Sequence, residues 1–113
     1  MHEIALCEGL VQALEEQAGS HGFRRVHRVW LEIGSLASVE RDAVRFNFDI
    51  MARGTIADNA QLDIMEVNGT AWCLPCGMAV DLHRFGDPCP NCDSRQLQVL
   101  DGTQIKIKKL EVT

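Results

Sequence analysis

Four of the five cysteines stand as two close pairs, Cys73 with Cys76 and Cys89 with Cys92, and twelve residues separate the pairs. Two intervening residues let both sulfurs of a pair reach one ion from a tight turn, and a second such turn completes a tetrahedron of thiolates. The segment 77–88 is long enough for a short hairpin that returns the second pair to the first. The spacing therefore predicts a structural zinc site with these four ligands.

Three other interpretations of the cysteines compete with zinc. Two disulfides would leave Cys7 over, and no signal peptide opens the chain, so we expect a reducing compartment such as the cytosol. A thioredoxin-like dithiol at residues 72–76 (WCLPC) should open a helix, but Gly77 and a strand-like stretch follow it. A rubredoxin-like iron site stays open, because the ligand type alone does not exclude iron.

Length and charge limit the classes of partner. At 113 residues the chain is one domain, or one small domain carrying a still smaller module. Eleven Lys and Arg against sixteen Asp and Glu leave a formal charge of −5, and non-specific nucleic-acid binding depends on neutralising phosphates. No apolar run approaches the ~20 residues of a membrane span. We therefore expect neither a nucleic-acid nor a membrane partner.

Hydrophobic periodicity predicts the elements that must position these groups. The first helix starts almost at the N-terminus and ends near residue 19, with an apolar stripe of Cys7, Leu10, Val11, Leu14 and Ala18. A second helix is predicted over 39–51, with a core face of Val39, Ala43, Phe46 and Ile50, widened by Val44 and Met51. Strands are predicted over 26–33, 61–67, 98–100 and 103–112, the last with a bulge near 108–109.

The order of these elements indicates an insertion. We expect an α+β fold with two helices on a three-stranded sheet and an inserted four-cysteine zinc-ribbon domain. Residues 1–70 and 99–113 would form the α+β domain, and residues 71–98 the zinc ribbon. Modules below ~40 residues usually need a metal or disulfides, so zinc is expected to hold the ribbon together.

The N-terminus offers a second set of metal ligands. His2 follows the terminal amine by one residue, so the amine, the His2 backbone nitrogen and the imidazole can close fused chelate rings on one ion. Planar nitrogen-rich sets suit Ni(II) or Cu(II), whereas zinc prefers a tetrahedron. Glu3 offers either a fourth ligand or an acidic residue that favours a helix start.

The N-terminal motif and the cysteine pairs together resemble one known family. Residues 1–4 (MHEI), 30–34 (WLEIG) and 39–40 (VE), followed by the two pairs, resemble the HypA/HybF family in order and in total length. The resemblance covers essentially the whole chain. It is specific because the N-terminal motif and the cysteine pairs are independent of each other.

The HypA/HybF resemblance implies a nickel chaperone for maturation of NiFe-hydrogenase and, in some organisms, urease. It implies that the α+β domain binds Ni2+, with His2 indispensable and with Met1 and Glu3 adding terminal and backbone nitrogens. The four cysteines would bind Zn2+. Implied partners are a nickel-handling maturation GTPase and the NiFe-hydrogenase large-subunit precursor in the cytoplasm, and a homodimer is left open.

No catalytic constellation is visible in the sequence. It contains no Gly-rich phosphate loop, so GTP hydrolysis would belong to a partner, and we expect no enzyme. Cys7 is expected to be a small buried apolar residue, and His83 a surface or packing residue. Two other functions stay open: a zinc-ribbon adaptor in a transcription or translation complex, and an electron-transfer protein with iron at the cysteines.

Overall fold

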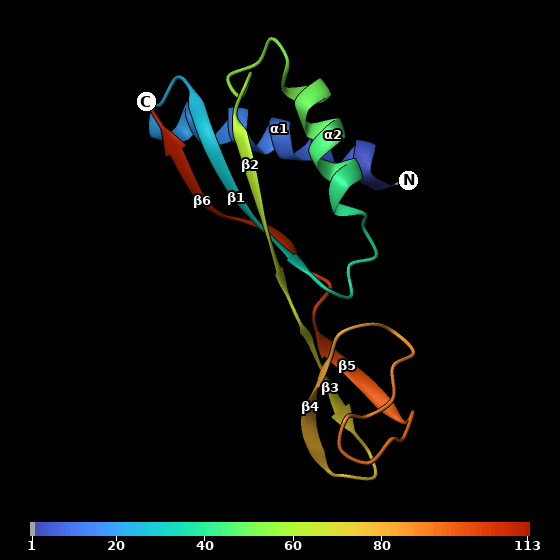
Figure 1. The fold of residues 1–113 in the computed structure, drawn as a ribbon. Helices are drawn as coiled ribbons and strands as arrows, with labels where there is room; N and C mark the ends of the chain where they lie inside the picture. Colours follow the sequence, from blue (N-terminus) through green and yellow to red (C-terminus); the bar gives the residue numbers. More distant parts are fainter. Residues whose placement is uncertain (1) are drawn as a thin grey trace. The chain divides into compact units, whose positions relative to one another are not determined.

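The computed structural model describes the backbone of residues 2–113 and the side chains of residues 3–113 (Figure 1). Its elements, in order, are α1 (His2–His21), β1 (Val26–Gly34), α2 (Arg41–Ala52), β2 (Gln61–Val67), β3 (Gly69–Cys73), β4 (Met78–Leu82), β5 (Leu97–Asp101) and β6 (Ile105–Val112). The chain forms two compact units. The first holds the residues up to Leu31 with 39–64 and 107–113, and the second holds 32–38 and 65–106.

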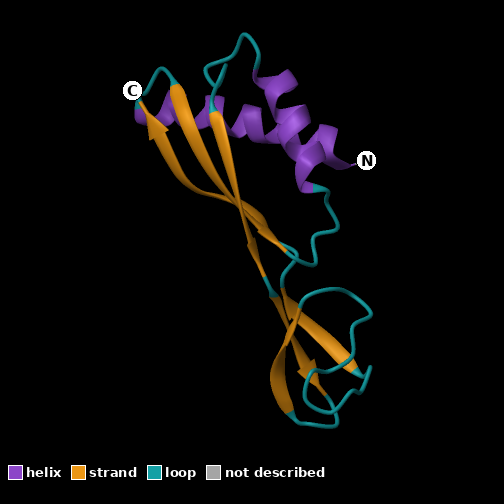
Figure 2. Cartoon of the chain, viewed as in Figure 1, coloured by secondary structure: helices purple, strands orange, loops and turns teal. Residues whose placement is uncertain are grey.

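Strand β1 is the centre of a three-stranded sheet with the order β2-β1-β6. Along β1 the side chains of Val29, Leu31 and Ile33 are buried and alternate with half-buried ones, as the period of two predicts. Helices α1 and α2, purple in Figure 2, pack against each other, and Leu14 and Phe48 are fully buried in the first unit. The predicted α+β fold with two helices and a three-stranded sheet is confirmed.

The buried face of α2 differs from the predicted one. Phe46 and Ile50, expected in the core, are 66% and 41% exposed, and the buried residues are Val44, Phe48 and Ala52. The helix has apolar residues on both sides, and Phe46 and Phe48 lie two apart, so they cannot face the same way. Periodicity within the helix therefore could not decide which phenylalanine faces the core.

This assignment of the core face is testable with two matched truncations. Phe48→Ala is expected to lower the free energy of unfolding by ~3–5 kcal/mol, because it leaves a cavity in the first unit. Phe46→Ala makes the same change on the exposed side and is expected to stay within about 0.5 kcal/mol of the parent. Urea denaturation followed by helical circular dichroism measures both. Equal losses in the two variants would contradict the assigned face.

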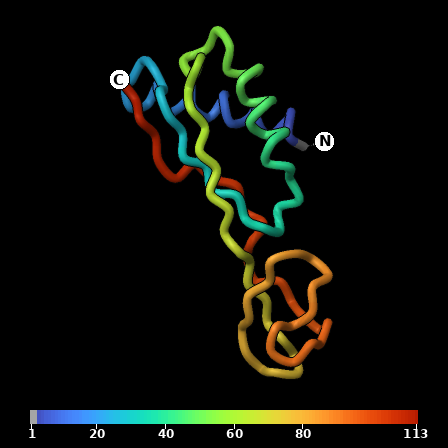
Figure 3. Tube along the Cα trace, viewed as in Figure 1, coloured from blue at the N-terminus to red at the C-terminus, as the bar shows by residue number. Residues whose placement is uncertain are grey.

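The second unit is built on an antiparallel sheet with the order β4-β3-β5. Figure 3 lets the reader follow the chain through this unit by colour. The segment between the cysteine pairs contributes one strand, β4, which pairs antiparallel with β3. The hairpin is therefore formed by β3 and β4, with the first cysteine pair at its turn, and not within residues 77–88 as predicted. The strands predicted near the C-terminus divide between the sheets, since β5 pairs with β3 and β6 pairs with β1. The predicted domain boundaries, at residues 70/71 and 98/99, stay a prediction. A compact unit is not the same as a domain that folds independently.

Three glycines allow close backbone contact in the second unit. A Cβ atom on Gly34 would lie 2.0 Å from the carbonyl oxygen of Gly102, and one on Gly69 would lie 2.7 Å from that of Asp101. The amide of Leu36 donates to the same Gly102 oxygen at 2.9 Å. The end of β1 therefore meets the β5–β6 connection without room for a side chain. In the described part of the chain, neither helix is long and apolar enough to cross a membrane.

Candidate metal centre

The two cysteine pairs adopt the same local turn. In the first, the amide of Gly77 donates to the carbonyl oxygen of Cys73 at 2.8 Å, and Gly77 has a φ of 63°. In the second, the amide of Asp93 donates to the oxygen of Cys89 at 2.9 Å, and Asp93 has a φ of 65°. Gly adopts this left-handed conformation freely, and Asp is among the few other residues that tolerate it. The residue after each second cysteine thus closes the turn.

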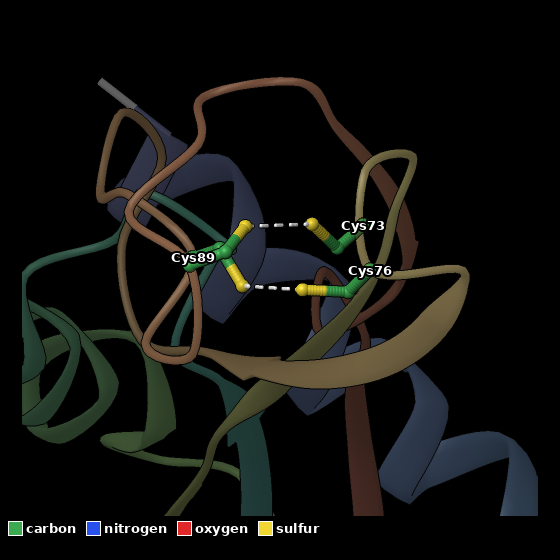
Figure 4. A group of neighbouring side chains, drawn as sticks. Cys73, Cys76 and Cys89 are labelled. Atoms are coloured by element: carbon green, nitrogen blue, oxygen red, sulfur yellow. Dashed lines mark hydrogen bonds between the residues drawn. The ribbon is translucent and has the colours of Figure 1, made fainter.

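The four sulfurs converge at one point of the second unit. All four Sγ atoms lie within 4.8 Å of one another. Cys73 and Cys92 are separated by 3.5 Å between sulfurs, and Cys76 and Cys89 by 4.0 Å; Figure 4 shows the labelled side chains pointing toward a common centre. A tetrahedron with Zn–S bonds of ~2.3 Å has sulfur–sulfur edges of ~3.8 Å. The donor set therefore fits a tetrahedral zinc ion.

The geometry decides against two of the competing interpretations. The sulfurs are far beyond the ~2.05 Å of a disulfide, and all four cysteines are free. The first pair is followed by strand β4, not by the helix that a thioredoxin-like dithiol requires.

Burial disfavours the thiolate form of these cysteines, which a metal ion would stabilise. Cys73 and Cys89 are 0% and 2% exposed and pack with Val80 and Leu97. Burial raises the pKa of the Cys73 thiol to about 12. At Cys89 burial also raises the pKa, but hydrogen bonds from backbone N–H groups, together with those from the neighbouring cysteine thiols, outweigh it and leave the pKa at about 7. A bound divalent cation deprotonates both thiols and compensates their charge.

His83, the histidine nearest the cysteines in sequence, is not a ligand. Its Nδ1 lies 2.7 Å from Oδ1 of Asn68, and its Nε2 lies 3.9 Å from a carboxylate oxygen of Glu66. Within the described side chains, the group placed to hold a metal is formed by the four cysteines alone. The expectation of a surface or packing role for His83 is confirmed.

The predicted nickel ligands lie at the edge of what the structure describes. Met1 and the imidazole of His2 lie outside the described residues, and the backbone of His2 begins α1. The carboxylate of Glu3 accepts a hydrogen bond from the backbone amide of Glu40 at 3.2 Å. Glu40 is the N-cap of α2, where a negative charge is favourable. The sequence indicated that Glu3 is an acidic residue that favours a helix start. It did not indicate that the helix whose start the Glu3 carboxylate contacts is the second one, α2.

Cys7 is a buried apolar residue, as predicted. Its side chain is 0% exposed, and its Sγ donates to the carbonyl oxygen of Val44 on α2 at 3.2 Å. Burial, and then the negative charge of Glu3, raise the thiol pKa to about 11. The thiol therefore stays protonated and joins the two helices.

Three comparisons place these features among known proteins. Residues 1–112 match the family described as "Hydrogenase/urease nickel incorporation, metallochaperone, hypA". The chain is 54% identical over 112 residues to the hydrogenase maturation factor HypA of Acidithiobacillus ferrooxidans, and 48% identical to that of Azotobacter vinelandii, covering 99% of each protein. The solution structure of the Ni metallochaperone HypA from Helicobacter pylori shares the fold, with a TM-score of 0.72 at 21% identity over 99% of this chain and 97% of that one.

Proposed function

The chain belongs to the HypA family of nickel metallochaperones for hydrogenase maturation, and we propose that its first three residues hold the Ni2+ that it delivers. The single observation that carries this proposal is the sequence Met1-His2-Glu3 directly at the start of α1. The four-cysteine cluster in the second unit would hold Zn2+ as a structural ion. The family match favours this reading over a zinc-ribbon adaptor.

The helix start supports nitrogen ligation by these residues. Helix α1 begins at His2, and the first four N–H groups of a helix have no intrahelical acceptor. Ni2+ can therefore displace the amide protons of His2 and Glu3 without breaking a helical hydrogen bond. The Glu3 carboxylate already accepts from Glu40, so the proposed contribution of Glu3 is its backbone nitrogen. The terminal amine of Met1 and the His2 imidazole complete a planar nitrogen-rich set.

A chain terminus suits transfer better than storage. A delivery site has to release its ion to an acceptor, and metal ligands with few supporting hydrogen bonds hold an ion less firmly than well-supported ones. We propose a nickel-handling maturation GTPase and the NiFe-hydrogenase large-subunit precursor as the partners, with a homodimer left open. The protein would catalyse no reaction of its own. Its five unpaired cysteines support a reducing compartment, which we take to be the cytoplasm.

Complementation tests the proposed delivery. In a host lacking its own protein of this family, the chain is expected to restore nickel to the hydrogenase large subunit, whereas His2→Ala is expected to fail because the chelate loses its imidazole. His21→Ala is the matched control, because this exposed histidine at the other end of α1 bonds only locally, with its Nδ1 3.1 Å from the oxygen of Gln17. Nickel per purified large subunit is the measurement. Equal rescue by His2→Ala would contradict the proposal.

A further inference from the structure

Asn91 makes two hydrogen bonds to the sulfurs of the four-cysteine cluster. Its backbone amide donates to Sγ of Cys89 at 3.4 Å, within its own cysteine pair. Its side-chain Nδ2 donates to Sγ of Cys76 at 3.4 Å, in the other pair. One residue of the second turn thus contacts a sulfur from each pair.

The negative charge of the metal-bound cluster makes these hydrogen bonds stabilising. Four thiolates around one Zn2+ leave a net charge of −2, and N–H groups that donate to sulfur withdraw part of that charge. The flanking residues of the second turn, Asp87 and Asp93, are acidic and add no compensation. Arg95, the nearest cation in sequence, donates to the carbonyl oxygen of Gly86. The amide of Asn91 is therefore a neutral donor to a cluster of negative charge.

The side chain of Asn91 also bonds to the more accessible side of the cluster. Cys73 and Cys89 are buried, whereas Cys76 is half-buried and Cys92 is exposed. A chelator or a competing metal must begin by displacing an accessible sulfur. The Cys76 sulfur, to which Nδ2 donates, is one of these two.

We propose that Asn91 is a positioning residue of the metal site, whose amide ties the second cysteine turn to the first and slows the exchange of the bound metal. The groups that orient metal ligands typically change metal affinity by ~10–100-fold when removed. Asn91→Ala should release zinc to an excess of chelator at least ~10-fold faster than the parent, at fixed pH. Asn91→Asp, which has the same shape but carries a second acceptor in place of the donor, should release it faster still.

The test uses the full chain and two readouts. Zinc release to a chromogenic chelator gives the rate, and Co(II) loaded at the same cysteines reports on the sulfurs through its thiolate-to-cobalt charge-transfer bands. Loss of an N–H donor raises the energy of the sulfur electrons, so both variants should shift these bands to lower energy. A merely looser fold would speed release without this shift. Asn68→Ala is the control, because Asn68 lies in the same unit and bonds to His83, away from the sulfurs.

Each possible outcome of this experiment either supports or overturns the proposal. Faster release together with a band shift in both Asn91 variants, and neither effect in Asn68→Ala, supports the proposal. Failure of Asn91→Ala to retain Co(II) where Asn68→Ala retains it also supports it. Release within about twofold of the parent, an unshifted spectrum, or equal acceleration in Asn68→Ala overturns it, since the proposal requires at least ~10-fold. Nickel at the N-terminus plays no part, so failure here leaves the proposed delivery function untouched.

Discussion

Removal of zinc is expected to unfold the β4-β3-β5 sheet while α1 and α2 stay folded. The core around the cysteines is small: Cys73 and Cys89 are buried there with Val80, and Leu97 packs against them. Apparent binding free energies of structural zinc reach ~10–16 kcal/mol at neutral pH, against a total stability of ~5–15 kcal/mol for a typical domain. The first unit instead buries large side chains, Leu14 and Phe48 among them. Amide resonances of the two sets of elements, recorded before and after chelation, measure this difference.

Single cysteine substitutions sharpen the same prediction. Cys89→Ser replaces a buried ligand with a weaker one and is expected to lower zinc from one per chain to near zero at micromolar protein. Cys7→Ala removes the cysteine that lies in the first unit and donates to Val44, so it should keep its full zinc content. Elemental analysis gives the stoichiometry and also detects iron. A folded ribbon sheet in metal-free protein, or iron in place of zinc, would contradict the structural zinc site.

Short-range patterns account for the parts of the fold that were predicted correctly. The alternation in β1 and the stripe on α1 each repeat over several turns or residue pairs, so one misplaced residue does not change the result. The cysteine cluster was predictable because each pair carries its geometry in its own spacing. The turns add only a left-handed residue, supplied by Gly77 and Asp93.

Contacts between distant segments were not predictable from these patterns. The core face of α2 is set by its neighbours, which bury Phe48 and leave Phe46 exposed. The Glu3 carboxylate reaches the amide of Glu40, and the Asn91 side chain reaches Cys76. Each of these contacts depends on how two turns or two helices meet, which composition and periodicity do not encode. Glu40, the N-cap of α2, makes no side-chain cap hydrogen bond of its own, and this too is visible only in the structure.

Nickel binding is expected to require both the free terminal amine and the imidazole of His2. Calorimetry on zinc-loaded protein with a native Met1 should show about one Ni2+ per chain, as a single chelate of amine, amide and imidazole nitrogens implies. His2→Ala should weaken binding by at least ~100-fold, since losing a ligand exceeds the ~10–100-fold cost of losing a supporting residue. A two-residue extension before Met1 should do the same, because it converts the amine into an amide. His21→Ala should bind like the parent.

The pH dependence gives an independent check on the amine. A terminal amine titrates near ~8 and must lose its proton to bind, so each unit of pH below that value should weaken nickel by ~10-fold or more. Affinity therefore rises with pH, and the rise becomes less steep above the amine pKa, because only the displaced amide protons then still make binding depend on pH. In the extended variant the new terminal amine lies outside the proposed chelate, so its residual nickel binding should not follow the titration of the amine. Equal affinities and equal pH profiles in the native and extended proteins would place the nickel elsewhere in the chain.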